Sequence, residues 1–199
     1  IGHIGCTSFF PSKNLGCYGD GGAIATNDDV LAAKMRMIAN HGQSERYYHD
    51  VVGCNSRLDT IQAAVLRIKL RKLDEYNQRR NAVAAHYDKF LGQIQGIQVP
   101  ARNTFSDHVF HQYTIKLSGI NRDELNKFLA EKDIPSMIYY PVPGHKQLMF
   151  SSFNLAEQNL PITDKLTPCV ISLPIHTEFE QAQLDYICAA IQEFVAIHV

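Results

Sequence analysis

A long stretch of helical periodicity between residues 60 and 91 constrains the fold of this chain most strongly. Apolar residues recur there at intervals of three and four, as in Ile61, Ala64, Val65 and Ile68. Helices of globular proteins usually run for about 8–20 residues, so the pattern predicts a bend or break near residues 70–74. We take this break as a domain boundary, which gives a first domain of residues 1–72 and a second domain of residues 73–199.

Short apolar segments alternate with amphipathic segments on both sides of this boundary. The first domain is predicted to be α/β, with a buried strand in residues 1–10, a second strand at 23–26, and a helix that Thr26 or Asn27 caps and that stops before His41. The alternation of strand-like and helix-like segments predicts a compact α+β arrangement for the second domain. Its expected strands are residues 97–100, 109–117, 137–140 and 169–173, and its expected helices are residues 121–131 and 178–197.

Composition excludes several classes of protein. The formal net charge of −1 gives no electrostatic reason to expect nucleic acid or an acidic membrane as a partner. No segment approaches the roughly 20 apolar residues of a membrane helix. The five cysteines are scattered without zinc-site spacing, so we expect no metal and instead reduced, buried thiols in a cytoplasmic protein. The chain opens inside a predicted strand without an initiator Met, and we therefore expect a fragment of a protein about twice this length.

Lys13 lies between the first predicted strand and a loop with four glycines, Gly16, Gly19, Gly21 and Gly22. Glycines let a backbone approach a bulky ligand closely and adopt positive φ without strain. A sheltered lysine amine is a good nucleophile toward an aldehyde, and the hydroxyls of Ser8 and Ser12 suit a neighbouring anion. The loop matches neither a phosphate-binding P-loop nor a G-x-G-x-x-G dinucleotide fingerprint. Spacing alone leaves an ordinary surface lysine as an open alternative.

Several motifs together resemble one family. The segment Thr7-Ser8-Phe9-Phe10-Pro11-Ser12-Lys13-Asn14-Leu15-Gly16, followed by residues 19–23, resembles the cofactor-lysine region of the DegT/DnrJ/StrS sugar-nucleotide aminotransferases. The resemblance continues in register through residues 41–43, 53–59, 62–64, 140–147 and 172–174. It implies the C-terminal part of a fold type I transferase that uses pyridoxal 5′-phosphate (PLP): the end of the large α/β domain followed by the small domain.

The resemblance also implies roles for individual residues. Lys13 would hold PLP as a Schiff base and shuttle a proton, and Ser8 would bind the cofactor phosphate. Asn55 would reach the phosphate of the neighbouring subunit's cofactor, with Arg57 in the same segment, which implies a homodimer with shared active sites. A serine that simply ends a strand remains the alternative for Ser8, and turn and cap chemistry remains the alternative for Asn55 and Arg57. Further phosphate donors and the acidic partner of the pyridine nitrogen would lie upstream of Ile1, so the fragment alone is expected to be inactive.

Tyr140 and His145 match the family's Tyr-Pro-x-Pro-x-His segment, which lines the sugar-nucleotide site; Gly144 stands where the family commonly has a bulky residue. His41, His108 and His111 are expected to have ordinary structural roles. The expected reaction passes an amino group from an amino acid, with glutamate as the expected donor, to a UDP-linked 3-keto or 4-keto hexose for surface polysaccharide. Two alternatives remain: a sugar dehydratase, in which histidine replaces the lysine, and a non-catalytic binding or regulatory protein of the same fold.

Overall fold

A computed structural model describes residues 2–153 and 158–198 of the chain, so Ile1 of the first predicted strand lies outside the described residues. The chain divides into two compact units, Ile1–Glu75 and Tyr76–Val199. None of the helices in the described part combines the length and hydropathy that crossing a membrane requires. The described residues also contain no group of three or more His, Cys, Asp or Glu side chains that could hold a metal ion.

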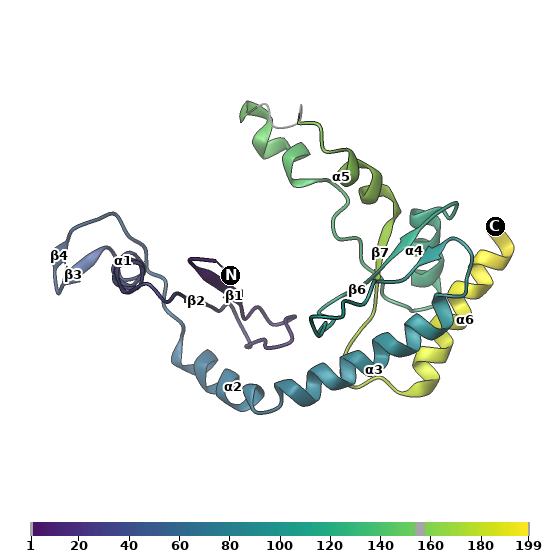
Figure 1. Cartoon of the computed structure of the whole chain (residues 1–199), viewed down its shortest axis with the longest axis horizontal. Helices are drawn as coiled ribbons and strands as arrows, with labels where there is room; N and C mark the ends of the chain where they lie inside the picture. Colours follow the sequence, from purple (N-terminus) through teal and green to yellow (C-terminus); the bar gives the residue numbers. More distant parts are fainter. Residues whose placement is uncertain (1, 154–157, 199) are drawn as a thin grey trace. The chain divides into compact units, whose positions relative to one another are not determined.

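The first unit is built from two small antiparallel sheets and two helices (Figure 1). Strand β1 (Gly5–Ser8) pairs with β2 (Gly22–Ala25), and β3 (Gln43–Glu45) pairs with β4 (Tyr48–His49). Helix α1 (Asp29–Ala39) follows β2, and α2 (Thr60–Leu70) is followed by a helix that starts at Leu73, still within the unit. The predicted break of the long helical stretch is therefore confirmed, at Arg71 and Lys72.

The start of α1 differs by one residue from the prediction. Asp28 is the N-cap, because its side-chain oxygen accepts hydrogen bonds from the backbone N–H groups of Val30 (2.9 Å) and Leu31 (3.0 Å). The Thr26 hydroxyl instead accepts from the Asp28 N–H and donates to the carbonyl of His3. Both predicted caps are thus wrong, although a polar residue of the same segment does the capping.

The prediction of a buried first strand is wrong. All four residues of β1 and all four of β2 are exposed. A hollow of about 900 Å³ lies between β2 and α1, so the helix does not pack tightly over the sheet. The hydrophobic residues that are buried among the described residues of this unit are Cys17 and Leu66. An apolar strand becomes buried only when another layer covers it, and no described helix does so here.

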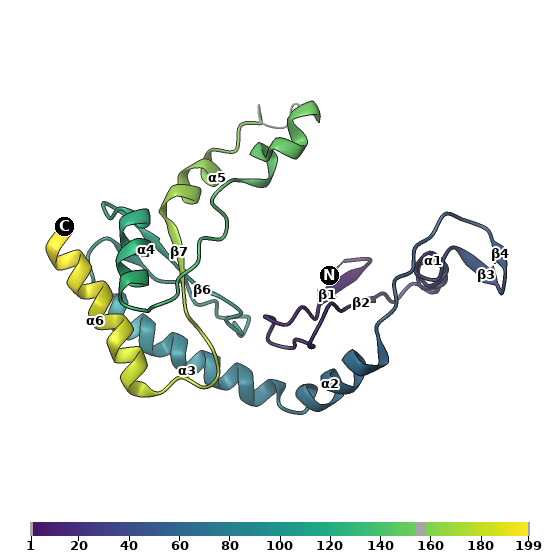
Figure 2. The same cartoon turned by 180° about the vertical axis from the view of Figure 1, so that it is seen from behind.

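The second unit combines a three-stranded antiparallel sheet with helices (Figures 1 and 2). The strand order is β5 (Ile97–Gln98), β6 (Tyr113–Leu117) and β7 (Val170–Leu173). The three long helices are α3 (Leu73–Leu91), which begins in the first unit, α4 (Arg122–Glu131) and α6 (Gln181–His198). Shorter helical segments are η1 (Gly144–Lys146), η2 (Leu148–Phe153), α5 (Pro161–Leu166) and η4 (Thr167–Cys169).

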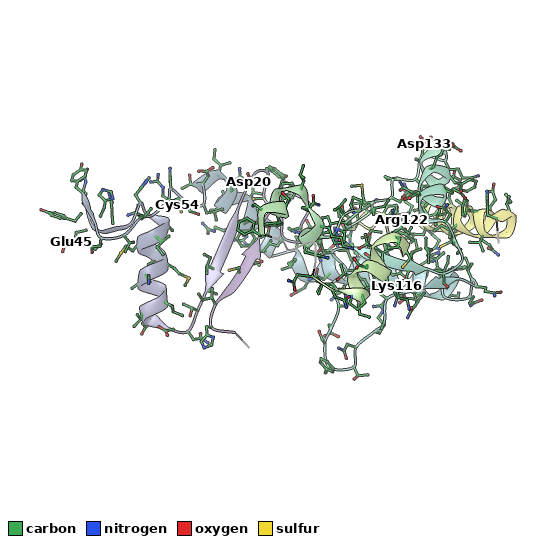
Figure 3. All side chains as sticks on the ribbon, turned by 90° about the horizontal axis from the view of Figure 1, so that it is seen from above. Asp20, Glu45, Cys54, Lys116, Arg122 and Asp133 are labelled. Atoms are coloured by element: carbon green, nitrogen blue, oxygen red, sulfur yellow. The ribbon has the colours of Figure 1, made fainter. Side chains whose placement is uncertain are left out.

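One hydrophobic core joins the helices and the sheet of this unit. Its fully buried members include Tyr87, Tyr113, Ile115, Leu125 and Ile191. Figure 3 shows the contrast with the first unit: side chains crowd together here and stand apart along α1. The alternation that predicted β6 appears directly as burial, with residues 113, 115 and 117 buried and the two between them half-buried.

The two tyrosine hydroxyls of this core have hydrogen-bond partners. The Tyr113 hydroxyl donates to Asp88 Oδ1 (2.6 Å), and Arg102 donates to Asp88 Oδ2 (2.6 Å). The Tyr87 hydroxyl donates to the carbonyl of Pro174 (2.9 Å). Burial, followed by the hydrogen bond to Asp88, raises the pKa of Tyr113 well above its ordinary value, so this hydroxyl remains a donor at physiological pH.

Several predicted strands are shorter than expected: the one predicted at 97–100 ends at Gln98, and two others have a clear local cause. Strand β6 begins at Tyr113 and not at Val109. Phe110 has a positive φ of 44°, and Arg80 donates hydrogen bonds to the carbonyls of Phe110 and His111, so these residues cannot join the strand ladder. In the segment 137–140, only Met137 pairs, forming a single bridge with Ser172. Prolines follow directly at positions 141 and 143, and a proline cannot donate to a strand ladder.

The cysteines differ in accessibility. All five are free, and Cys17 and Cys188 are buried while Cys6 and Cys54 are exposed. The expectation that the thiols are all buried is therefore wrong. Burial raises the pKa of Cys188 to about 12, and a neighbouring Asp185 adds to the effect. The nucleophilic thiolate of Cys188 is then essentially absent at pH 8.

We therefore expect a thiol reagent at pH 8 to modify Cys6 and Cys54 rapidly and to leave Cys188 unmodified until the second unit unfolds. Peptide mass spectrometry after timed labelling measures this order. Equal labelling rates of Cys54 and Cys188 in the folded chain would contradict the burial described here.

Candidate functional site

Lys13 lies in a tightly bonded loop that leaves β1 at Ser8 and enters β2 at Gly22. The Phe9 N–H donates to the carbonyl of Gly21 (2.8 Å), and the Cys17 N–H donates to the carbonyl of Phe9 (2.8 Å). Nearer the tip, the Lys13 N–H donates to the carbonyl of Phe10 (2.9 Å). Lys13 is half-buried. The turn therefore fixes the backbone of Lys13, and the residue is only partly exposed to solvent.

The glycines of this loop do not have the positive φ that was predicted for them. A Cβ at Gly16 would lie 2.5 Å from the carbonyl oxygen of Pro11, and a Cβ at Gly21 would lie 2.9 Å from Cys17 Sγ. The close approach is thus between parts of the loop itself. Glycine is needed at these positions so that the loop can fold back on its own backbone.

Ser8 lies at the end of β1, where its hydroxyl oxygen accepts a hydrogen bond from the Phe10 N–H (3.2 Å). A serine hydroxyl carries one hydrogen in addition to its lone pairs. Ser8 is exposed, so this hydrogen can be donated to an anion. Ser12 is exposed in the same loop and offers a second hydroxyl.

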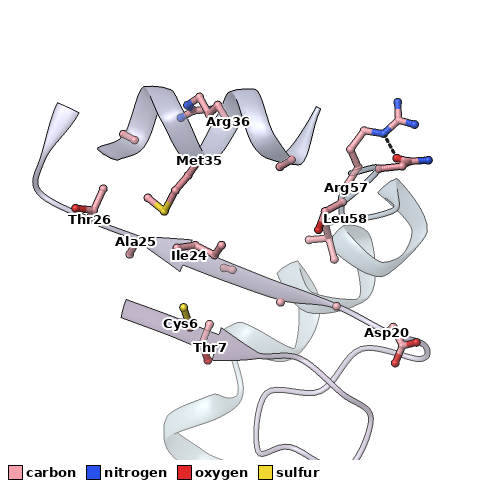
Figure 4. Close-up of a pocket in the computed structure, with 17 residues that line it drawn as sticks. Cys6, Thr7, Asp20, Ile24, Ala25, Thr26, Met35, Arg36, Arg57 and Leu58 are labelled. Carbon is pink, nitrogen blue, oxygen red and sulfur yellow. Dashed lines mark hydrogen bonds between the residues drawn. The ribbon is translucent and has the colours of Figure 1, made fainter. Parts of the chain in front are cut away.

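Asn55 and Arg57 come together in the first unit, and the dashed line at Arg57 in Figure 4 marks the hydrogen bond between them. Arg57 Nε donates to Asn55 Oδ1 at 2.8 Å, and both residues line the hollow of about 900 Å³ with Thr7 and Arg36. This bond uses the acceptor of the Asn55 amide and leaves its NH₂ group as a donor. Guanidinium and amide N–H groups together suit an anion. Lys13 and Ser8 do not line this hollow.

Tyr140 and His145 lie in the second unit. Tyr140 is exposed and, with Gly144, lines a hollow of about 560 Å³ whose other wall includes Thr163 and Thr167. A Cβ added at Gly144 would meet no atom within 4 Å, so glycine leaves open space in this wall that a larger residue would occupy. His145 does not line the hollow; its Nε2 is buried and has no hydrogen-bond partner among the described residues.

Two residues that the sequence analysis did not single out support the Lys13 loop. Lys69 Nζ donates to the carbonyl of Gly16 (2.7 Å), and Gln62 Oε1 accepts from the Tyr18 N–H (2.8 Å). Both side chains come from α2. Their separation of seven residues, two helical turns, was the available signal, but it carries meaning only once the loop is known to lie against that helix.

Comparison with known proteins gives this arrangement a context. Residues 1–192 match the DegT/DnrJ/EryC1/StrS aminotransferase family. The chain belongs to this family. Its aminotransferases depend on PLP, and one structure similar to this chain was solved with bound cofactor PMP, the amine form. The predicted family and its cofactor are confirmed.

Relatives in the family are similar over nearly the whole chain. The UDP-2-acetamido-2-deoxy-3-oxo-D-glucuronate aminotransferase of Pseudomonas aeruginosa is 46% identical over 188 residues, which cover 94% of this chain and 51% of the relative. A pleiotropic regulatory protein of Geobacillus stearothermophilus is 45% identical, over 98% of this chain and 53% of the relative. The chain thus spans about half the length of the curated relatives it matches.

The fold of the family is confirmed in the same way. The structure of DesV from Streptomyces venezuelae in complex with a ketimine intermediate superimposes with a TM-score of 0.90 at 40% identity. The match covers 98% of this chain and 52% of that one. The mixed α/β architecture described above is therefore that of the C-terminal portion of this aminotransferase fold.

The residues of this chain fit part of a PLP site. A half-buried amine at Lys13 suits the aldehyde, and the Ser8 hydroxyl, the Asn55 amide and the Arg57 guanidinium are the donor types that bind phosphate. The loop that holds Lys13 begins at Ser8, so these two groups are linked by a short and well-bonded segment. Asn55 and Arg57 form a separate cluster.

Proposed function

We propose that this chain supplies the cofactor lysine to a PLP-dependent aminotransferase of sugar nucleotides. The reaction passes an amino group from an amino acid, with glutamate as the expected donor, to a UDP-linked 3-keto or 4-keto hexose used for surface polysaccharide. One observation supports it most directly: Lys13 is held half-buried at the tip of a bonded loop that starts at Ser8. The 46% identity to the P. aeruginosa aminotransferase supports the choice of substrate class.

The chain's own residues have distinct tasks in this reaction. When bound, PLP acts as an electron sink for the carbon that loses a proton. The Lys13 amine would hold the cofactor through its aldehyde carbon and, when free, would take up and return the proton. Ser8 would donate its hydroxyl hydrogen to the phosphate and so help to hold the cofactor in position. The bonded loop orients the Lys13 backbone, so the amine returns to the same place in each cycle.

Asn55 and Arg57 are proposed to act on the cofactor phosphate of a second subunit. Their cluster lines a hollow to which Lys13 and Ser8 of the same chain do not contribute. This separation supports a homodimer in which each active site takes residues from two chains. Tyr140 and His145 are proposed to line the sugar-nucleotide site, and the open wall at Gly144 makes room for the sugar. Residues 1–72 then belong to the large cofactor domain and residues 73–199 to the small domain.

The direct test uses a chimera that joins the first half of the P. aeruginosa aminotransferase to residues 1–199. After incubation with PLP, borohydride reduction should leave the cofactor covalently attached to Lys13, and peptide mass spectrometry locates the adduct. In a separate, unreduced sample, glutamate should convert the bound cofactor to its amine form, with release of 2-oxoglutarate. A chimera that binds PLP without a reducible bond to Lys13 would favour the dehydratase, and one that binds no PLP would favour the regulatory protein.

Mixing two defective chimeras tests the shared site. Lys13→Ala and Asn55→Ala subunits are each expected to be inactive alone. After they are unfolded together and refolded, half of the dimers are hybrids, and each hybrid contains one intact site if Asn55 crosses between subunits. Activity should therefore recover to about a quarter of that of the unsubstituted chimera. No recovery despite hybrid formation, checked by native mass spectrometry, would show that Asn55 serves its own chain.

A further inference from the structure

We infer that Lys69 and Gln62 are positioning residues for Lys13, an inference that rests on the proposed role of that lysine. The two side chains come from one face of α2 and bind the backbone of the loop that contains Lys13. They do not touch the reacting atoms. Their effect is to hold the loop in one conformation, so that the Lys13 amine is presented at a fixed place.

Lys69 anchors the middle of the loop. Its ammonium group donates to the carbonyl of Gly16 at 2.7 Å, a short distance for a charge-assisted hydrogen bond, and the bond is partly buried. The same ammonium lies 4.8 Å from the centre of the Tyr18 ring, within the range of a cation–π contact. A single lysine side chain thus contacts the loop on both sides of Cys17.

Gln62 anchors the loop at Tyr18. Its side-chain oxygen accepts the Tyr18 N–H at 2.8 Å across 44 residues of sequence. A Cβ at Gly19 would approach Gln62 Nε2 to 3.0 Å, so glycine at this position lets the loop lie against the glutamine. The backbone N–H of Tyr18 would otherwise depend on water, because the loop's internal bonds do not use it.

The spacing of the contact residues matches the helix geometry. Gln62, Leu66 and Lys69 are separated by four and three residues, so they lie on one face of α2. Leu66 is the buried residue of that helix. The loop therefore has two kinds of restraint: internal hydrogen bonds fix the turn at Lys13, and this face of α2 fixes the segment from Gly16 to Tyr18.

Loosening this second restraint should affect catalysis more than binding. A displacement of about 1 Å of a reacting group can reduce rate by about a hundredfold, while contacts that only bind substrate remain unchanged. Replacing Lys69 by Met keeps the alkyl stem and removes the charge and the donors. We expect Lys69→Met to lower the kcat of the chimera by about 10-fold to 100-fold with KM unchanged. Lys69→Arg retains a cationic donor and should restore most of the rate.

Hydrogen exchange on the 199-residue chain tests the restraint without any cofactor. The amides of Lys13 and Cys17, which bond to Phe10 and Phe9, should exchange about tenfold faster in Lys69→Met, the loss expected for one charge-assisted hydrogen bond. Gln62→Leu should have a similar effect centred on Tyr18. Lys72→Met is the matched control, because Lys72 lies in the turn directly after α2 and pairs with Glu75 at the surface. In Lys72→Met, the amides of the loop that contains Lys13 should exchange at the same rate as in the unsubstituted chain.

The outcomes separate this inference from the proposed function. Faster loop exchange with a lower kcat, both reversed in Lys69→Arg, supports the positioning role. Loop exchange or kcat indistinguishable between Lys69→Met and Lys72→Met overturns it. If the unsubstituted chimera forms no adduct at Lys13, then the proposed function is wrong and the positioning role falls with it, whereas an adduct with an unaffected loop contradicts the positioning role alone.

Discussion

Lys13→Arg in the chimera with the P. aeruginosa enzyme is expected to lower turnover by about 10⁴-fold or more, since proton transfer by a positioned side chain contributes about 10²–10⁴ and the covalent role is lost as well. Arginine retains the positive charge and nearly the length of lysine. Its guanidinium cannot lose a proton in a protein, so it neither condenses with an aldehyde nor acts as a base. The loop around it should stay folded, because the bonds that hold it come from the backbone and from α2.

The measurement is glutamate-dependent amination of a UDP-linked 3-keto sugar, followed by chromatography of the sugar product. Lys34→Arg on the exposed face of α1 is the matched control and should retain full activity. PLP binding by absorbance should persist in Lys13→Arg, while the borohydride-stable adduct should disappear. Turnover within tenfold of the control would refute the assignment of Lys13 as the cofactor lysine.

Ile191→Ala is expected to reduce the free energy of unfolding of the second unit by about 2–5 kcal/mol. Ile191 on α6 is fully buried in the core that includes Phe194 and Ile115. Removing its side chain loses both the burial of the removed methyl and methylene groups and the packing around them, because a close-packed core fills the resulting cavity only in part. A loss of this size is a large part of the stability of a small domain.

Ile197→Ala provides the control within the same helix. Ile197 is 66% exposed, so its truncation should change the free energy of unfolding by less than about 0.5 kcal/mol. Urea denaturation followed by far-ultraviolet circular dichroism of the 199-residue chain gives both values. Equal destabilisation by the two substitutions would show that α6 does not bury the face described here.

Periodicity predicted most of the helices, because each has a face that packs locally or a clear cap. The break at Arg71 and Lys72 was predictable from length alone, and Asn121 caps α4 as an Asn before an acidic first turn should. Tertiary contacts decided the exceptions. The strand predicted from Val109 is interrupted where Arg80 donates hydrogen bonds to the carbonyls of Phe110 and His111. That arginine lies about 30 residues away in sequence.

The candidate site was predictable to the extent that its motifs are local. Lys13 and Ser8 belong to one short segment, so the family resemblance located both at once. Gln62 and Lys69 were missed as supports because their contacts with Tyr18 and Gly16 span 44 and 53 residues. The positive φ expected of the loop glycines was wrong, and the sequence does not reveal that Gly16 packs against the carbonyl of Pro11.

The uneven distribution of buried side chains affects how this polypeptide is made. The described members of the hydrophobic core all come from residue 83 onward, whereas Ile24, Val30 and Val52 of the first 75 residues are exposed. Translation makes those residues before it makes the second unit, so their exposed apolar side chains are present before the core of the second unit can form. Holding chaperones and slow synthesis at low temperature should therefore improve the yield of this polypeptide more than stabilising its later half would.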